Sequence, residues 1–354
     1  VAWLLASYAR EALARVEEAD LPALDALRGA LEGALGMTLE GEKGEHFFRS
    51  TLVQTLFYGI FSAWVIWSRD HPPTSEEEFK WHEAGWTLHV PMIAALYQQI
   101  AQPTRLGPLG IVEVLDWAAD ALSRVERASF FEQFNEGQAV QYFYEPFLQA
   151  FDPELRKELG VWYTPEEIVR YMVERVDTVL REELDIPDGL ADPNVYVLDP
   201  CCGTGAYLVA VLDRIARTLD ERGGDALVAQ DIKRAATERV FGFEILPAPF
   251  VVSHLQLGLL LRNLGAPLSH DKGERAGVYL TNALTGWERP GETKRALPFP
   301  EFQEEAEAAD HVKREVPILV VLGNPPYNGY ADVAIGEERE LSNAYRTSKR
   351  APKP

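Results

Sequence analysis

The chain has 354 residues, enough for two domains and a sizeable core. Hydrophobic residues make up 47% and charged residues 25%, which is ordinary for a globular protein. The formal net charge of −21 argues against a broad DNA-binding face, so any contact with nucleic acid must be local or come from residues outside this stretch. An acidic surface that keeps the protein soluble is the simpler interpretation.

Cysteine content and hydropathy bear on the compartment. The neighbours Cys201 and Cys202 are the only cysteines. Adjacent cysteines rarely satisfy disulfide geometry, and nothing else completes a zinc site. We therefore expect a cytoplasmic protein without a metal. No signal peptide opens the sequence, and the apolar stretch from Leu56 to Trp67 is too short to span a bilayer, which predicts a buried helix and no membrane partner.

Residues 1–150 are predicted to form an all-α domain. Apolar residues recur at helical spacing between Tyr8 and Glu32, and the segment from Phe47 to Ser68 is apolar nearly all round, as in a central core helix. Helices are expected again over 111–150. The histidines of this domain are scattered, which favours a structural or interaction role.

Residues 151–354 alternate between helical segments and short apolar runs. Four predicted strands lie at 195–198, 240–243, 278–281 and 318–322. Three predicted helices lie at 165–183, 205–222 and 248–264. This alternation predicts an α/β fold with a Rossmann-like, doubly wound parallel sheet. The polar segment 285–314 is expected to be a surface excursion.

The first motif stands directly before the helix predicted at 165–183. Thr164 is the predicted N-cap, with Pro165 at the first helical position and Glu167 completing a capping box. Free N–H groups at this helix end, together with Thr164, are suited to bind a carboxylate. Taken alone, the motif is equally a good helix cap.

The second motif joins the first strand to the next helix. It begins with Asp199 and Pro200 and ends with Gly203, Thr204 and Gly205. Glycines let the backbone pass close to a ligand, and the helix start offers free N–H donors. The acid is suited to accept a hydrogen bond from a ligand ammonium group or to order the loop. The pattern lacks the three glycines of a dinucleotide site, and a tight strand–helix connection is the competing interpretation.

The third motif places Glu244 at the end of the second strand. An acid there can bind both hydroxyls of a ribose, as in dinucleotide folds. Glu244 follows Asp199 at more than twice the usual spacing of about 20 residues, which an insertion over 221–231 accounts for. A glutamate that faces solvent at a strand end is the alternative.

The fourth motif is Asn324-Pro325-Pro326-Tyr327, at the end of the apolar run from Val316 to Leu322. The run is expected to be a fully buried strand, and ligands bind at the carboxyl ends of such strands. Two prolines keep the loop stiff and extended. An asparagine amide and a backbone carbonyl can then point at one amino group beside an aromatic face. This combination suits a flat, amino-bearing substrate such as a nucleobase.

In this order, the four motifs resemble those of the gamma-class amino-group DNA methyltransferases, which modify adenine at N6. The lead-in from Phe143 to Lys157 and the tail from Tyr330 to Arg339 are similar to the methylase part of single-polypeptide Type I and Type IIG restriction-modification enzymes. The resemblance covers about residues 140–345. It implies an incomplete S-adenosylmethionine-dependent methyltransferase fold, and residues 1–150 resemble the helical coupler of these enzymes only loosely.

The resemblance implies a catalytic loop at 324–327. Asn324 and the carbonyl of Pro325 would accept hydrogen bonds from the adenine amino group, with Pro326 holding the loop. Tyr327 would stack on the base, which must be flipped out of the duplex to reach it.

The resemblance also implies that S-adenosyl-L-methionine is the cofactor. Thr164 would bind its carboxylate, Asp199 with the glycines its methionine part, and Glu244 its ribose. Asn282 would bind the adenine edge, although an asparagine there would equally cap a loop. The implied cofactor-binding set is Tyr163, Thr164, Pro165, Asp199, Pro200, Gly203, Thr204, Gly205, Glu244 and Asn282.

Double-stranded DNA is the implied partner, bound through a target-recognition domain, together with nuclease or helicase domains or subunits of the same defence system. Both chain ends are expected to be cuts through a longer protein, with further strands and the recognition domain outside it. We therefore expect weak cofactor binding, no site-specific methylation by this chain alone, and an unprotected sheet edge at the last strand. RNA-adenine or protein-glutamine methylation, and a non-catalytic S-adenosylmethionine-binding module, are the alternatives.

Overall fold

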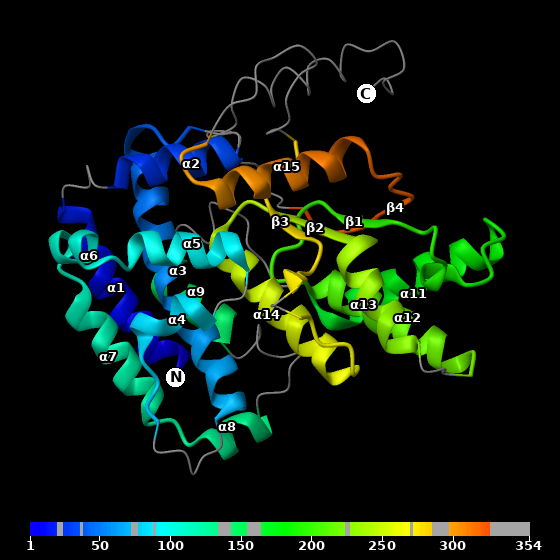
Figure 1. Cartoon of the computed structure of the whole chain (residues 1–354), viewed down its shortest axis with the longest axis horizontal. Helices are drawn as coiled ribbons and strands as arrows, with labels where there is room; N and C mark the ends of the chain where they lie inside the picture. Colours follow the sequence, from blue (N-terminus) through cyan, green and yellow to red (C-terminus); the bar gives the residue numbers. More distant parts are fainter. Residues whose placement is uncertain are drawn as a thin grey trace.

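The computed structural model describes ten stretches of the chain: 1–19, 24–35, 38–71, 77–87, 90–133, 143–153, 164–223, 227–269, 272–284 and 297–325. In Figure 1, N-terminal helices coloured blue to cyan lie beside a region, green to orange, in which helices surround a sheet. This arrangement confirms an α/β fold preceded by helices.

The N-terminal region is helical, as predicted. Its helices are α1 (Ala2–Glu18), α2 (Asp25–Leu35), α3 (Gly41–Asp70), the 3-10 turn η2 (Trp81–Glu83), α4 (Ala84–Thr87), α5 (Pro91–Ile100), α6 (Pro103–Leu109), α7 (Val112–Ser123), α8 (Arg127–Gln133) and α9 (Glu145–Phe151). The apolar residues at helical spacing between residues 8 and 32 are divided between α1 and α2. The division arises because Ala19 has extended backbone angles that end α1.

Helix α3 is the core of this region. It is 30 residues long, far longer than the apolar stretch expected to be buried. By length and composition it could cross a membrane, but 89% of its apolar window is buried inside the protein. Helices α1, α5 and α7 pack against it, and Trp64 and Phe57 are almost fully enclosed. Its apolar character is therefore accounted for by packing between helices.

The C-terminal region is built around a parallel sheet. Its elements are α11 (Glu166–Glu182), the 3-10 turn η5 (Gly189–Ala191), β1 (Val197–Asp199), α12 (Ala206–Glu221), α13 (Val228–Glu238), β2 (Val240–Glu244), α14 (Pro247–Asn263), β3 (Val278–Leu280), α15 (Pro300–Arg314) and β4 (Val320–Val321). The described strands run in the order β3-β2-β1-β4. All three pairings are parallel. The predicted Rossmann-like sheet is confirmed.

Helices cover both faces of the sheet. Helices α12, α13 and α14 contact one face, where Val197, Val240 and Val278 join the main core. Helix α15 covers the other face, with Val312 against Phe241 and Phe243. The prediction of a surface excursion over 285–314 is therefore wrong for 300–314. Its polar composition concealed apolar residues at helical spacing.

Strand β4 differs from its prediction as a fully buried strand. It forms the edge of the described sheet next to β1. Val320 and Leu322 are buried, whereas Leu319 and Val321 are 50% and 64% exposed. A continuous apolar run does not reveal that only one of its faces is covered. The expected unprotected edge is found within the described residues.

The two regions share packing. Helix α14 lies against α3, and α15 contacts α2 and α5. Buried residues from both regions belong to one continuous core. The boundary at residue 150 stays a prediction, because the structure supplies no break in the core at that point.

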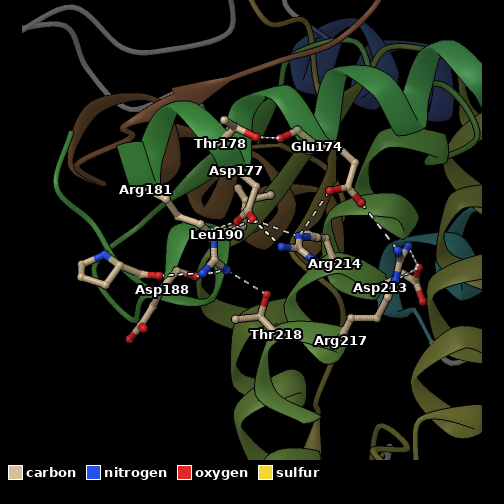
Figure 2. A network of polar contacts seen from close by, with 11 residues as sticks. Glu174, Asp177, Thr178, Arg181, Asp188, Leu190, Asp213, Arg214, Arg217 and Thr218 are labelled. Carbon is tan, nitrogen blue, oxygen red and sulfur yellow. Dashed lines mark hydrogen bonds and ion pairs between the residues drawn. The ribbon is translucent and has the colours of Figure 1, made fainter. Parts of the chain in front are cut away.

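A buried ion network fixes α11 to α12 (Figure 2). Asp177 of α11 is 2% exposed and accepts a hydrogen bond from the Leu190 N–H at 2.8 Å. Its other oxygen accepts from Arg181 at 2.8 Å and from Arg214 of α12 at 2.8 and 3.0 Å. Burial acts to raise the pKa of Asp177, but the Leu190 N–H and the two guanidinium groups lower it overall. The charged carboxylate is thus the stable form.

We expect Asp177→Ala to lower the free energy of unfolding by about 3–5 kcal/mol, because it leaves buried charges and an N–H group unpaired. The lowered pKa means that this stabilisation is present above about pH 4 and is lost as the pH falls through the folded-state value. Urea unfolding at several pH values measures it. Asp213→Ala, which removes a half-exposed pair with Arg217, is the control and should cost about 0.5 kcal/mol or less.

Candidate cofactor and base site

The predicted site residues gather at the carboxyl edge of the sheet. Asp199 ends β1 and Glu244 ends β2, while Asn282 follows β3 and Asn324 follows β4. Because the strands are parallel, their carboxyl ends meet at one edge. A groove of about 900 Å³ between α13 and residues 265–275 lies at the opposite ends of the strands and contains none of these side chains.

The glycine-rich loop after β1 is held by its neighbours. The Cys202 N–H donates to the Phe243 carbonyl of β2 at 2.9 Å. Gly203 and Gly205 have φ angles of 55° and 91°, in the left-handed region that favours glycine. From α14, the buried Gln256 amide donates to the Thr204 carbonyl at 2.6 Å. Pro200 lies in the turn that starts this loop.

The sequence analysis did not identify Gln256 or Ser253, which lies one helical turn before it, as site residues. A methyl group added to Gly205 would lie 3.2 Å from the Ser253 Cβ, so α14 sits directly beneath the loop. A signal was available in the sequence: both are polar residues in a largely apolar helix, and both are buried.

Asp199 is buried without full hydrogen bonding. It is 0% exposed, and its Oδ1 accepts from the Cys201 N–H at 3.1 Å. Its Oδ2 has no hydrogen-bond partner among the described residues. Burial, with a contribution from nearby Glu244, raises the pKa of Asp199 to about 7. A buried, unpaired carboxyl oxygen is unfavourable alone and fits a ligand that supplies a cationic donor.

Glu244 is also buried, at 8% exposure, so the solvent-facing interpretation is wrong. Its Oε1 accepts from the N–H groups of Ile245 and Leu246 at 2.9 and 2.8 Å. Burial raises the pKa of Glu244 to about 7, although these N–H groups and that of Gly203 act to lower it. The predicted insertion over 221–231 leads into α13, so two consecutive helices set the spacing between Asp199 and Glu244.

Asn282 serves as a loop cap in this structure. Its Oδ1 accepts from the Leu284 N–H at 2.9 Å. Lys313 of α15, which the sequence analysis missed, donates to Thr281 Oγ1 at 2.7 Å and to the Asn282 carbonyl at 2.8 Å. Burial lowers the pKa of Lys313 to about 8. The role of Asn282 at a cofactor adenine stays a prediction.

Thr164 and Asn324 meet although 160 residues separate them in sequence. The Asn324 Nδ2 donates to Thr164 Oγ1 at 3.1 Å. The predicted capping box is wrong: α11 begins at Glu166, Pro165 is its N-cap with extended angles, and no side chain caps it. Tyr163, Pro326 and Tyr327 lie outside the described residues.

Gly323 is a further site residue that the sequence analysis missed. A methyl group on it would lie 2.4 Å from Asp199 Oδ1 and 3.3 Å from Cys201 Sγ. Burial raises the pKa of the Cys201 thiol, and the nearby backbone N–H of Asn324 acts to lower it. Only glycine lets the chain after β4 pass this close to the Asp199 carboxyl.

The described residues fit an S-adenosylmethionine-type ligand in the chemistry of their donors and acceptors. Two buried carboxyls suit an ammonium group and a ribose, and a glycine loop at a helix start leaves backbone N–H groups near them. No group of three or more His, Cys, Asp or Glu side chains that could hold a metal occurs in the described part of the chain.

Comparison with known proteins agrees with this geometry. The sequence profile of the family described as N-6 DNA Methylase matches residues 136–276. This stretch is similar to the N-6 DNA methylases. It contains Thr164, Asp199 and Glu244, whereas Asn282 and Asn324 lie beyond it.

A curated relative agrees with this match. The chain is similar to the Type I restriction enzyme EcoEI methylase subunit of Escherichia coli. The two are 26% identical over 179 residues, which cover 47% of this chain and 31% of the relative.

Solved structures share the fold across nearly the whole chain. The Type ISP restriction-modification enzyme LlaGI, as a nuclease-deletion mutant with a DNA substrate mimic, matches with a TM-score of 0.57 and 18% identity over 99% of this chain. The DrdV–DNA complex matches with a TM-score of 0.62 and 19% identity over 99% of this chain. The Type ISP enzyme LlaBIII bound to DNA matches with a TM-score of 0.61 and 17% identity over 98% of this chain. The chain spans only 26%, 31% and 22% of these three chains.

We expect Gly323→Ala to lower the free energy of unfolding by about 1–3 kcal/mol, since the new methyl group forces Asp199 or the loop to move. Chemical denaturation measures the change. Gly258→Ala in α14 is the matched control: nothing lies within 4 Å of its added methyl group, so it should be neutral or stabilising by up to about 1 kcal/mol. Equal effects of both substitutions would contradict the close approach at Gly323.

Proposed function

We propose that this chain is the catalytic core of an S-adenosylmethionine-dependent DNA adenine-N6 methyltransferase from a restriction-modification or phage-defence system. The observation that carries the proposal is the meeting of Asn324 with Thr164 beside the buried carboxyl of Asp199. This contact puts the loop suited to an amino group next to the corner suited to a charged cofactor.

Each residue has a defined task in this proposal. Asp199, with the backbone around Gly203 and Gly205, holds the methionine part of the cofactor, and Glu244 holds its ribose hydroxyls. When bound, S-adenosylmethionine supplies an electrophilic methyl group on a sulfonium centre. Gln256 and Ser253 support the loop from below and keep its amides in place.

Asn324 and the Pro325 carbonyl act on the methyl acceptor. As hydrogen-bond acceptors for the adenine amino group, they increase the electron density on its nitrogen, and the prolines keep both acceptors rigid. Positioning and electrostatics supply the rate enhancement. Tyr327 stacks on a base flipped out of the duplex.

Double-stranded DNA is the proposed partner, in the host cytoplasm. Each of the three solved neighbours is a complex with DNA or with a DNA substrate mimic. With a net charge of −21, this chain offers little general attraction for phosphates. DNA recognition, and any nuclease or helicase activity, is therefore assigned to other domains or subunits.

The function is tested by methyl incorporation in the full-length protein. With tritiated S-adenosylmethionine, we expect label in DNA as N6-methyladenine, and Asn324→Ala to lower kcat at least about 100-fold through loss of a transition-state contact. RNA and protein are assayed side by side. Label in RNA or protein alone, or Asn324→Ala with unchanged DNA methylation, would refute the proposal.

Cofactor affinity should depend on pH. The pKa values of Asp199 and Glu244, each raised to about 7 by burial, leave both groups largely protonated below pH 7. An ammonium ligand favours the ionised form, so its affinity should weaken as the pH falls from 8 to 6, by up to about tenfold per unit for each displaced proton.

Calorimetric titration with S-adenosylhomocysteine, which keeps the ammonium group, in buffers of different ionisation heat counts the protons released. Asp199→Asn is the control and should weaken binding while flattening the pH dependence. A wild-type affinity that is constant from pH 6 to 8 would contradict the assignment of these carboxyls to the cofactor.

A further inference from the structure

Thr164 contacts the proposed catalytic residue directly. Its Oγ1 accepts a hydrogen bond from Asn324 Nδ2 at 3.1 Å, in a partly buried setting. We propose that Thr164 is a positioning residue for Asn324, fixing which end of the Asn324 amide faces the methyl acceptor. The inference rests on the proposed function and adds a role that a cofactor-binding corner does not require.

The chemistry of an amide makes such a residue necessary. An asparagine side chain has an acceptor oxygen and a donor nitrogen of nearly the same shape, so a half turn exchanges them. Only the oxygen can accept from an amino group, whereas the nitrogen would oppose a donor. A hydroxyl can also donate to an amide oxygen, so it selects between the two orientations only when its own proton is directed to another acceptor, here the carboxylate of the proposed cofactor. It then accepts from Nδ2 and makes the productive orientation the stable one.

The backbone of Asn324 is already held by other contacts. Gly323 packs directly onto the Asp199 carboxyl, and the Asn324 N–H lies close enough to the Cys201 thiol to act on its pKa. Pro325 restrains the following bond. We therefore expect the contact with Thr164 to act on the rotation of the Asn324 side chain more than on the placement of the loop.

Thr164 itself is rigidly placed. It stands two residues before α11, and α11 is tied to α12 by the Asp177 network (Figure 2). Helix α12 starts at the glycine loop after Asp199. The hydroxyl that orients Asn324 is thus fixed to the same framework as the proposed cofactor loop, and the two halves of the site keep a constant relation.

A positioning role and a cofactor-binding role predict different kinetics. A threonine hydroxyl has two acceptor sites and one donor. The contact with Asn324 uses an acceptor site, so the donor stays available for a cofactor carboxylate. Removing only the cofactor contact weakens ground-state binding, whereas removing the orientation of Asn324 lowers the rate of the bound complex.

The test uses the full-length protein with Thr164→Val, Thr164→Ser and the control Thr178→Val. Thr178 lies on α11, and within the described part of the chain its hydroxyl bonds only to the Glu174 carbonyl of its own helix (Figure 2). We expect Thr164→Val to lower kcat about tenfold, a loss typical of one hydrogen bond. The kcat of Thr164→Ser should stay within about threefold of the wild-type value, and Thr178→Val should have the same kcat as the wild type.

Two further measurements separate a positioning role of Thr164 from a role in cofactor binding alone. S-adenosylhomocysteine binding, measured by calorimetry, should change less than kcat in Thr164→Val. In an Asn324→Asp background, where both side-chain oxygens accept, orientation no longer matters and Thr164→Val should cost less than about twofold.

Three outcomes overturn the inference. An unchanged kcat with a weakened S-adenosylhomocysteine affinity assigns the hydroxyl to the cofactor alone. An equal loss from Thr164→Val in both backgrounds shows that the effect does not pass through the amide. Absence of methyl transfer by the wild-type protein removes the proposed function and this inference together, and so is distinguished from the first two.

Discussion

The parallel pairing of β1 with β2 on one side and with β4 on the other is the constraint on which the site depends. Asp199 pairs with Gly242, and Val197 pairs with both Val240 and Val320. This register brings the ends of β1, β2 and β4 together. Gly242 contributes to this arrangement: a methyl group there would lie 2.6 Å from Leu208 Cδ1 of α12 and 3.0 Å from the Cys202 sulfur, so glycine leaves room for both α12 and the loop after β1.

The carboxyl edge of the sheet also brings acidic side chains together in a buried position, where the charged form of a carboxyl is unfavourable. Asp199 and Glu244 are enclosed, and burial raises both of their pKa values to about 7. Protein stability does not call for two such groups side by side, because buried carboxyls oppose folding when they ionise. In Asp177, by contrast, arginines and an N–H group surround the charge and lower the pKa. The fully paired Asp177 thus belongs to a structural network, whereas Asp199, whose Oδ2 has no partner among the described residues, marks the proposed binding site.

Local chemistry made much of the site predictable, and long-range packing made the rest unpredictable. Asp199, Gly203 and Glu244 were found because strand ends and glycine turns leave marks within a few residues. Lys313 and Gln256 were missed because their partners lie 31 and 52 residues away. Fold class followed from the alternation of helices and apolar runs. The half-exposed position of β4 could not be predicted in this way, because an edge position depends on what packs beside the strand.

The helical region belongs to the framework of the site. Helix α14 packs on α3 from one side and, through Gln256, holds the Thr204 carbonyl of the glycine loop on the other. Buried residues run without a break from α3 through α14 to the sheet. A shift of α3 would therefore reach the loop through one rigid helix, since close-packed interiors transmit displacement. The N-terminal helices thus supply support that the small sheet, with its two-residue edge strand, lacks by itself.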